Sequence, residues 1–274
     1  MSLPGHQSER RKRFYATADV GPMNGGFGVR LDGRTPKSPA GVSLVLPTEA
    51  LAQLVAAEWA AQGEHIDPVS MPATRLAWAA LALDEAGRAA AVERVASFAG
   101  TDLLCYFADW PSDLLERQER RWGPVIAWAD AALGVTFHRT QGIIHQPQPQ
   151  GTLDRIAELA ATEDAFTLTG LAEAAALFGS AMLAFALRRS ELTADAAFDL
   201  SRLDEIFQEE RWGVDAEAAA RADRMAKEAV ALGRWFWALL TAGDLAAISA
   251  RRLARMGGIA PDLEVPPRRR SDPT

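Results

Sequence analysis

The feature that most constrains the fold of this chain is a change in hydrophobic period near residue 48. Before that point, the sequence consists of short β-prone segments separated by glycine and proline. From Thr48 onward, apolar residues recur every three or four positions, which is the spacing of amphipathic helices. One segment cannot satisfy both periods, so we expect two differently built regions. The predicted fold class is α+β, with a small N-terminal antiparallel β module followed by a larger, mainly α-helical domain.

The β module is predicted from four short segments and one turn signal. The dipeptide Asp32-Gly33 favours a hairpin turn, because both central positions of such a turn require positive φ. The glycine-rich run 21–28 lies between strands and does not open a helix, so we interpret it as a turn and not as a nucleotide-binding loop. The expected strands are Phe14–Tyr15, Ala18–Val20, Phe27–Leu31 and Val42–Leu46.

The region after the β module is expected to be a series of helices. Thr48 is a suitable N-cap for the first helix, and Gly63 follows the predicted end of that helix at Gln62. The further predicted helices cover 75–83, 88–98, 102–108, 112–122, 124–133, 153–161, 169–189, 194–211 and 216–240. The predicted parts of the chain are a flexible basic N-terminus (1–12), the β module (13–47), the helical domain (48–240), and an additional helix with a disordered tail (241–274).

Charge and apolar content argue against two classes of partner. The chain has 36 acidic and 29 basic residues, giving a net charge of −7, which is unlike a nucleic-acid-binding domain. Its longest apolar stretch, Ala174–Leu187, has 14 residues, fewer than the roughly 20 that cross a bilayer. The basic residues near the N-terminus are not followed by an apolar run with a cleavage site, so no secretory signal or transit peptide is expected. We therefore expect neither nucleic-acid binding nor membrane insertion.

The sequence lacks the common signatures of catalysis and cofactor binding. It contains no GxxxxGK[ST] phosphate loop, no HExxH motif and no GxSxG elbow. Cys105 has apolar neighbours, which favour a packed thiol over an activated nucleophile. His138 and His145 could approach each other, but no acidic residue lies near them in sequence, so we interpret them as loop residues. We predict no catalytic residue, metal or cofactor, and the single cysteine is consistent with a reducing compartment.

An acidic segment towards the C-terminus is the most informative polar feature. If residues 194–211 form one helix, its apolar stripe reaches Phe207, and Glu210 lies three residues further on the same face. Glu205 and Glu209 then fall on the opposite, solvent-facing side. A carboxylate on an apolar stripe must be paired, protonated or placed at the exposed end of the stripe. Either Glu210 reaches solvent or an arginine at the helix end, or it is a polar anchor in an apolar recognition surface.

Three further patterns concern packing more than chemistry. Asp215 is suited to cap the next helix, with Glu217 in its first turn. Gln118 and Trp122 are four residues apart, so they share one helical face. The eight tryptophans belong to the core or to interfaces, where this side chain contributes large apolar area. Taken residue by residue, the chain is a β-plus-α protein without a visible catalytic constellation, which favours binding over catalysis.

Several short motifs, each weak alone, occur together along most of the chain. They are Phe27–Arg34; Glu58-Trp59 with Gln62 and 66–68; Met71-Pro72; Thr101–Tyr106; Gln118 with Trp122; and Phe207-Gln208 with Trp212-Gly213, Asp215 and Glu217-Ala218. In this order they resemble the assembly chaperones that bind the α subunit of the catalytic head of ATP synthase, a family of mitochondria and related bacteria. Phe107 and Gly123 depart from the family pattern, in which arginine and aspartate are expected more often.

The resemblance implies a chaperone without enzymatic activity or cofactor. Such a protein holds the free α subunit before it joins the α/β hexamer, and it shields the surface that the β subunit later covers. The implied location is the bacterial cytoplasm, or the mitochondrial matrix if the source is eukaryotic. We expect the chaperone to be a monomer.

The partner is expected to contact the acidic helix end, and the Thr101–Tyr106 motif is assigned mainly to folding. Two alternatives stay open. One is a helical scaffold for a different protein partner, and the other is a hydrolase that uses paired carboxylates such as Glu209 and Asp215. The predicted partner-binding residues are Glu205, Glu209, Glu210, Trp212 and Asp215.

Overall fold

The fold is taken from a computed structural model that describes residues 11–38, 41–142, 144–241, 243–246 and 248–250. Its contacts divide the chain into two units, Met1–Leu239 and Leu240–Thr274. In the second unit, residues 243–246 and 248–250 are helical. Residues 251–274 of the predicted tail, and residues 1–10 of the predicted flexible N-terminus, lie outside the described residues.

The first unit begins with the predicted antiparallel sheet. In the described part of the chain its strands are β1 (Ala18–Met23), β2 (Gly26–Leu31) and β3 (Val45–Leu46). They pair in the order β1-β2-β3, with Val20 opposite Val29 and Phe27 opposite Leu46. The glycine-rich run supplies the ends of β1 and β2 and the turn between them, in which Gly25 has a φ of 91°.

The predicted turn at Asp32-Gly33 is also confirmed. The two residues have φ angles of 48° and 78°. The backbones of Leu31 and Arg34 exchange two hydrogen bonds across them, of 2.8 Å and 3.0 Å. Positive φ at both central positions is the geometry of a two-residue hairpin turn, in which glycine is the least strained residue.

The rest of the first unit is mainly helical, as predicted from the change in period. The elements after β3 are α1 (Glu49–Ala60), η1 (Pro68–Ser70), α2 (Pro72–Leu81), α3 (Glu85–Gly100), η2 (Leu103–Cys105), β4 (Tyr106–Phe107), α4 (Ser112–Leu133), β5 (Thr140–Gln141), α5 (Gln150–Ala161), α6 (Ala165–Phe178), α7 (Ala181–Arg188), α8 (Ala194–Ser201), α9 (Leu203–Trp212) and α10 (Ala216–Leu239). In the described part of the chain, no helix has an apolar stretch of the length that a bilayer requires.

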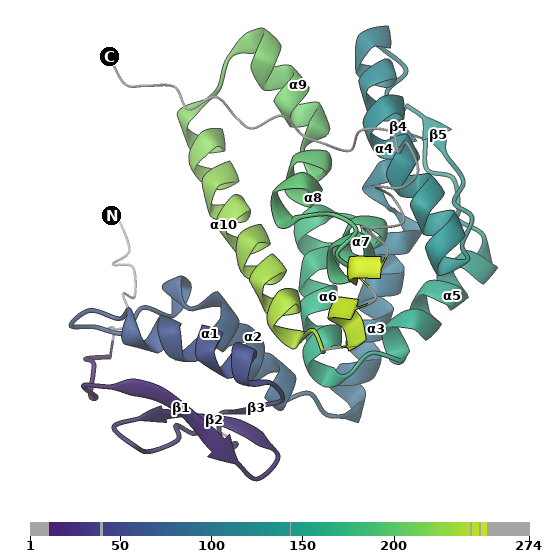
Figure 1. The fold of residues 1–274 in the computed structure, drawn as a ribbon. Coiled ribbons are helices and arrows are strands. Elements are labelled where there is room, and N and C mark those ends of the chain that lie inside the picture. Colours follow the sequence, from purple (N-terminus) through teal and green to yellow (C-terminus); the bar gives the residue numbers. More distant parts are fainter. Residues whose placement is uncertain (1–10, 39–40, 143, 242, 247, 251–274) are drawn as a thin grey trace, which may run out of the picture. The chain divides into compact units, whose positions relative to one another are not determined.

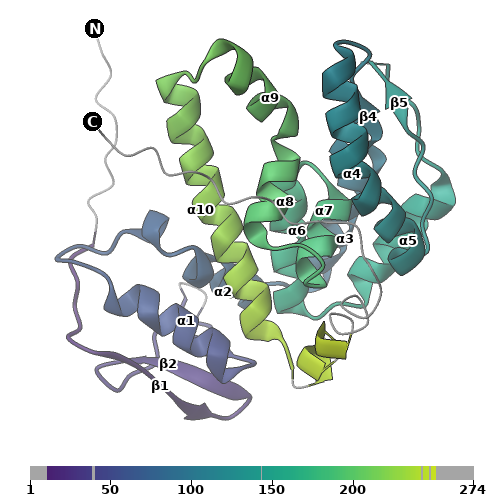
Figure 2. The same cartoon turned by 45° about the horizontal axis from the view of Figure 1, so that its top comes forward.

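Helix α1 covers one face of the three-stranded sheet (Figures 1 and 2). Thr48 caps it, since Oγ1 accepts a hydrogen bond from Leu51 N at 3.1 Å. The same hydroxyl donates to the Ala238 carbonyl at 2.6 Å, which links the start of α1 to the end of α10. The predicted strand at Phe14–Tyr15 is wrong, since neither residue belongs to a strand, and the buried Tyr15 side chain instead packs on α1, where its hydroxyl donates to the Trp59 carbonyl at 2.7 Å.

Helices α6 and α7 form the centre of the helical region. The sequence predicted one helix over 169–189, but Gly179 adopts a left-handed φ of 62° and ends α6. Ser180 then begins α7, because its hydroxyl accepts a hydrogen bond from Leu183 N. Every residue from Ala181 to Leu187 is buried. A helix that is apolar on all sides must be surrounded by other elements.

Two other helix boundaries differ from the prediction. Residues 112–133 form one continuous helix, α4, although Pro124 lies inside it. The proline removes a single backbone donor, and the buried side chains along α4 from Leu114 to Leu133 offset that loss. The predicted helix over 194–211 instead breaks at Arg202, whose φ of −118° is not helical, and forms α8 and α9.

The predicted helix over 102–108 is replaced by the single turn η2 and the strand β4, which pairs in parallel with β5. The fully buried Asp102 carboxylate accepts hydrogen bonds from Leu104 N at 3.1 Å and Met182 N at 3.0 Å. Burial raises the pKa of this carboxyl group to about 6. Asp102 therefore joins η2 to the start of α7, which is the folding role predicted for the Thr101–Tyr106 motif.

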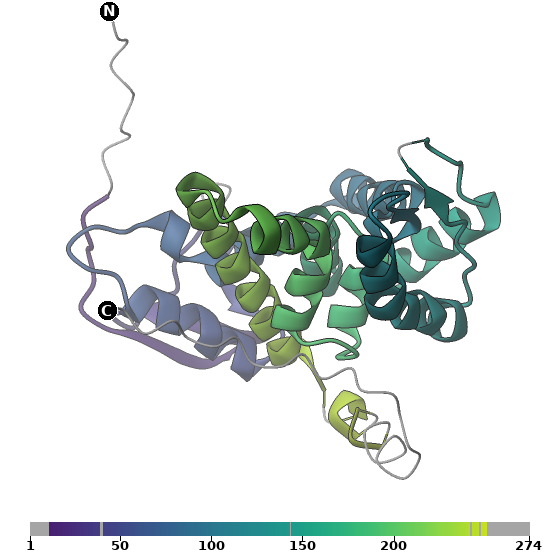
Figure 3. The ribbon, with the colours of Figure 1, turned by 90° about the horizontal axis from the view of Figure 1, so that it is seen from above.

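Helix α10 connects the sheet-covering helices to the central ones. It packs against α1 and α2 on one side and against α6 and α8 on the other (Figures 1 and 3). Gly170 on α6 permits this close approach, because a Cβ there would lie 2.8 Å from the indole ring of Trp235. The buried Trp235 donates its ring N–H to the Phe166 carbonyl at 3.1 Å.

We predict that Asp102→Asn removes part of the pH dependence of folding stability. The folded pKa of about 6 lies above the value of roughly 3.9 for an unfolded aspartate. The folded state therefore binds this proton more tightly, so the stabilisation is complete below the unfolded pKa and is lost as the pH rises through 6. The loss for this group is on the order of 3 kcal/mol.

The measurement is urea-induced unfolding of both proteins at about pH 4 and about pH 7. The asparagine side chain does not titrate, so the substitution itself changes the folding free energy by the same amount at both pH values. The stability of the wild type relative to the variant is thus expected to fall between the two pH values. A relative stability that stays constant across this range would contradict the assignment.

Candidate functional site

Helix α9, which carries most of the predicted site residues, is fixed to α4 by two ion pairs. Arg117 on α4 donates to Glu210 at 2.7 Å. Arg211 on α9 donates to Asp113 in the first turn of α4. The four side chains are 30% to 52% exposed, so each pair alone contributes little free energy. Together they hold the C-terminal end of α9 beside the N-terminal end of α4.

The ring of Phe207 connects the two ion pairs. The guanidinium carbons of Arg117 and Arg211 lie 5.1 Å and 4.3 Å from its centroid. Phe207 is itself buried, so it adds apolar contact area while its π face attracts both cations. Phe207 and Arg211 are four residues apart on α9, so the helix itself brings them together. This group of three side chains is the main connection between the ends of α4 and α9.

Buried polar groups hold the same helices further along. Gln118 accepts a hydrogen bond from Ala108 N at 2.7 Å and donates to Asp204 at 2.8 Å. Trp122 donates its ring N–H to the Leu200 carbonyl at 3.0 Å. Gln118 and Trp122 are both buried, as their shared helical face predicted. Burial raises the pKa of the Asp204 carboxyl group, and the hydrogen bond from Gln118 partly opposes that shift.

The two neighbouring acids of α9 have the opposite environments to those expected from sequence. Glu209, expected on the wet face, is 26% exposed and pairs at 2.6 Å with Arg202, which is 12% exposed. Glu210, expected on the apolar stripe, is exposed, and the hydrogen bond from Arg117 lowers its pKa. The reason is that α9 ends at Trp212, so Glu210 lies at the open end of the stripe. The interpretation in which Glu210 reaches an arginine is confirmed.

Large apolar side chains face solvent around this junction. Trp212 and Val214, at the turn from α9 to α10, are 74% and 59% exposed. Trp110, just before α4, is 78% exposed. Glu205 is exposed on α9 itself. We refer to the exposed residues Trp110, Glu205, Trp212, Val214 and Asp215 as the α9–α4 surface.

Asp215 has the predicted capping role. Its carboxylate accepts hydrogen bonds from the backbone N–H groups of Glu217 at 3.1 Å and Ala218 at 3.0 Å, at the start of α10. The carboxylate also complements the positive end of the helix dipole. Asp215 thereby sets the direction in which the chain leaves the turn next to Trp212.

The α9–α4 surface has the chemistry of a protein contact. Exposed tryptophans are typical anchors of protein interfaces, because they bury large apolar area at a small entropic cost. The carboxylates required by the hydrolase alternative are already engaged, Glu209 by Arg202 and Asp215 by the backbone of α10. Within the described residues, no cluster of three histidine, cysteine or acidic side chains could hold a metal ion. The Cys105 thiol is buried, and burial raises its pKa far above its usual value, as expected of a packed thiol.

Another set of motif residues connects α1 to η1 and α2. The Glu58 carboxylate accepts hydrogen bonds from the backbone N–H groups of Ala73 and Thr74, each at 2.7 Å. Gln62 accepts a hydrogen bond from Asp67 N at 2.7 Å and donates to Ser70 at 3.1 Å. These side chains satisfy the N-terminal donors of α2 and of the segment before it. Their role in this structure is to orient α2 relative to α1.

Sequence reasoning missed Trp110 and the two arginines that fix α9. Arg211 could have been found from its four-residue spacing from Phe207. Arg117 comes from a helix 93 residues away in sequence, and no local pattern connects it to Glu210. Trp110 was counted among the tryptophans, but its exposure depends on the loop before α4.

We predict that Arg117→Ala loosens α9 without unfolding the protein. The substitution removes the ion pair with Glu210 and one of the two cations on Phe207, a loss of about 1 kcal/mol. Amide hydrogen exchange within α9 is expected to accelerate by roughly fivefold, with a smaller change elsewhere. The matched control is Arg94→Ala, which breaks the exposed Arg94–Glu173 pair on α3 and α6. Equal exchange rates in α9 for Arg117→Ala and the wild type would contradict the role of this contact.

Comparisons with known proteins agree with the motifs and the fold. The family model described as ATP12 chaperone protein matches residues 12–130. The mitochondrial protein atp12 of Schizosaccharomyces pombe is 26% identical over 214 residues, 74% of this chain and 74% of that protein. The crystal structure of Atp12 from Paracoccus denitrificans has a TM-score of 0.78 and 38% identity, covering 84% of this chain and 99% of that one. A crystal structure of a protein from Agrobacterium tumefaciens has a TM-score of 0.79 and 37% identity, and the match covers 84% of this chain and 86% of that one. The chain therefore belongs to the ATP12 family of chaperones.

Proposed function

We propose that this protein is an assembly chaperone of ATP synthase that binds the free α subunit of the catalytic head. It shields the interface of that subunit with the β subunit until the hexamer assembles, and it does so without catalysis. The observation that carries this proposal is the α9–α4 surface, with strongly exposed Trp212 at the end of α9 and Trp110 in the loop before α4, beside helix ends fixed by ion pairs. Membership of the ATP12 family and the motif resemblance support the choice of partner.

The physical need for such a chaperone follows from the nature of subunit interfaces. Obligate interfaces are large and apolar, so an unpaired subunit exposes a surface that aggregates. A chaperone must cover part of that surface with apolar groups of its own. Trp110, Trp212 and Val214 provide such groups on a rigid base. Release requires no nucleotide, because the more extensive contact with the β subunit displaces the chaperone by mass action.

The residues of the predicted site take different roles in this proposal. Trp212 and Glu205 contact the partner directly, because both are exposed and neither packs into the core. Glu209 and Glu210 act indirectly by pairing with arginines that position α9. Asp215 fixes the turn in which Trp212 and Val214 lie.

The state and location of the chaperone are part of the same proposal. It acts as a monomer, because a chaperone that masks one interface needs one copy of its binding surface. In a bacterium it acts in the cytoplasm, and in a eukaryote in the mitochondrial matrix, where the catalytic head is assembled. The relatives include both a mitochondrial and a bacterial protein.

The direct test is co-purification with α and β subunits expressed separately from the same source. Size-exclusion chromatography is expected to show a complex with α alone, which disperses when β is added. Light scattering of warmed α subunit is expected to fall in the presence of the chaperone. Failure to bind or protect soluble α subunit would contradict the proposal and would favour a scaffold for another partner.

We predict that Trp212→Ser weakens binding of the α subunit by at least roughly tenfold, because interface tryptophans are frequent hot spots. The fold should not change, since Trp212 is 74% exposed.

Glu205→Lys is expected to weaken binding of the α subunit by reversing a charge on the same surface. Affinity is measured by titration of labelled α subunit.

The matched control is Val69→Ser, which removes an apolar side chain on η1 that is 73% exposed. It is expected to leave binding of the α subunit unchanged. If Val69→Ser and Trp212→Ser weakened binding equally, the α9–α4 surface would not be the specific contact.

A further inference from the structure

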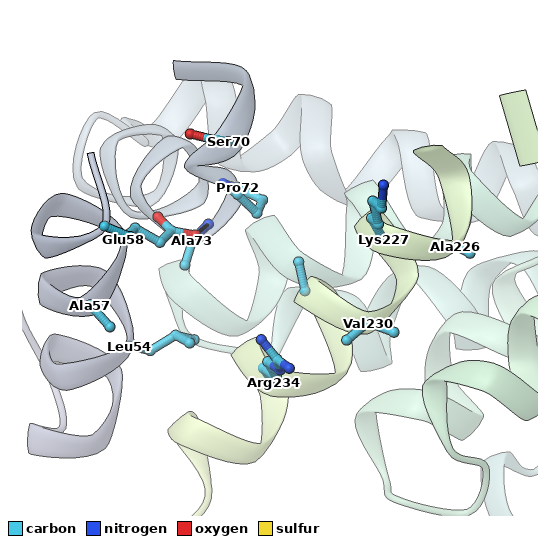
Figure 4. Close-up of a pocket in the computed structure, with 12 residues that line it drawn as sticks. Leu54, Ala57, Glu58, Ser70, Pro72, Ala73, Ala226, Lys227, Val230 and Arg234 are labelled. Atoms are coloured by element: carbon cyan, nitrogen blue, oxygen red, sulfur yellow. Dashed lines mark hydrogen bonds between the residues drawn. The ribbon is translucent and has the colours of Figure 1, made fainter. Parts of the chain in front are cut away.

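A cavity of about 530 Å³ lies between α1 and α10. One wall comes from α1, with Leu54, Ala57 and Ala61, and the opposite wall comes from α10, with Val230 and Ala231 (Figure 4). Its lining is predominantly apolar. The N-terminal turn of α2 closes one end through Pro72 and Ala73. We refer to this cavity as the α1–α10 cleft.

The lining of the α1–α10 cleft has an excess of positive charge, with two cations and one acid. Glu58 is the single acid in its lining, and its carboxylate is already occupied by the backbone of α2 and the Thr74 hydroxyl. Lys227 and Arg234 both line the cleft from α10 (Figure 4). Lys227 pairs with Asp223 at the surface, with both side chains more than 60% exposed, so that pair is weak and exchangeable. In the described part of the chain, no hydrogen bond or ion pair engages Arg234.

The cleft continues along one face of α10. Lys227, Val230, Arg234 and Trp237 follow one another at spacings of three, four and three residues, so they form one stripe of the helix. Trp237 is 58% exposed at the end of this stripe. Lys227 and Arg234 are seven residues apart, which places them about 10 Å apart along the axis. The stripe is thus cation, apolar, cation, apolar, with Val230 half-buried between the two exposed cations.

We propose that the α1–α10 cleft binds an acidic amphipathic helix of a partner protein. A helix with two carboxylates seven residues apart places them on one face at the same spacing as Lys227 and Arg234. Apolar side chains three or four residues from each carboxylate then enter the cleft between Ala57 and Val230. Trp237 packs against the end of the bound helix. This is the helix-in-groove mode of recognition, with charge complementarity fixing the direction and register.

Charge distinguishes this occupant from a segment of the chain itself. Residues 251–274 contain six arginines against three acidic residues, so their charge matches that of Lys227 and Arg234. Like charges on both sides disfavour docking of that segment. The cleft uses α1, the first turn of α2 and residues 226–234 of α10, and it shares no residue with the α9–α4 surface. The inference therefore goes beyond the proposed function and does not rest on it.

The probe is a fluorescein-labelled synthetic helix of about five turns, with glutamates seven residues apart and leucines three and four residues after the first glutamate. Its binding to the full-length protein is measured by fluorescence anisotropy. Saturable binding that weakens as salt is raised is expected, because screening reduces the charge contribution. A second peptide with lysine in place of each glutamate is expected to bind at least roughly tenfold more weakly.

Two sets of variants locate the binding site. Lys227→Glu combined with Arg234→Glu is expected to reverse the preference, so that the lysine peptide binds more tightly than the glutamate peptide. Ala57→Phe fills the cleft from an exposed position of α1 and is expected to reduce binding of the glutamate peptide by at least roughly tenfold. Ala127→Phe, at an exposed alanine of α4 outside the cleft, is the matched control and should leave binding unchanged. Circular dichroism of each variant verifies that the fold is retained.

Three outcomes would overturn the proposal. The first is equal binding of the glutamate peptide by the wild type and Ala57→Phe. The second is dimerisation of the wild type that Ala57→Phe abolishes, which would make a second copy the occupant. The third is a gain of tenfold or more in peptide affinity when residues 251–274 are removed, which would make the chain's own C-terminal segment the occupant.

Discussion

The burial of α6 and α7 is the constraint on which the rest of the fold depends. All residues from Ala181 to Leu187 are buried, so α7 has no face that can meet water. Such a helix is stable only when other elements surround it, and α3, α4, α6, α8 and α10 all pack against it. The buried Asp102 carboxylate satisfies a backbone donor at the start of α7, which would otherwise remain unpaired inside the protein. The positions of α4, α9 and α10 follow from this arrangement.

Two exposed surfaces of contrasting character result from the placement of the outer helices. The α9–α4 surface presents tryptophans beside the exposed carboxylates of Glu205 and Asp215, while the neighbouring Glu209 and Glu210 pair with arginines that hold α9 in place. The α1–α10 cleft presents apolar walls beside two cations. The two surfaces share no residue, so substitutions in one test its proposed role separately from that of the other. The ion pairs around Phe207 hold α9 in place, which reduces the ordering cost of the binding proposed there.

Much of the fold could be predicted from sequence because it depends on local patterns. The change of period at Thr48, the turn at Asp32-Gly33 and the cap at Asp215 are properties of adjacent residues. Two of the errors occurred where distant contacts decide the structure. Residues 106–107 form a strand because they pair with 140–141, and Pro124 is tolerated because α4 is packed along its length.

The same distinction applies to the candidate site. The helical position of Glu205 and Glu210 could be predicted from sequence, as could the resemblance to an assembly chaperone, whereas the break at Arg202 and the inclusion of Trp212 in α9 could not. The sequence did not predict that Glu209 is the more buried acid and Glu210 the exposed one, because this depends on where α9 ends and on arginines from other elements. The α1–α10 cleft could not be predicted from the sequence either, since the residues of its two walls are more than 160 positions apart in the chain.

The most direct test of the central claim is site-specific photo-cross-linking to the α subunit. A Glu205→Cys variant carries a benzophenone at the α9–α4 surface, and the fully buried Cys105 leaves the introduced thiol as the accessible labelling site among the described residues. If the α9–α4 surface binds the α subunit, efficient cross-linking to free α subunit is expected, and it should disappear once β has been added. Cross-linking that is absent, or that is no stronger than from an equivalent label in a Val69→Cys variant, would contradict the proposed contact.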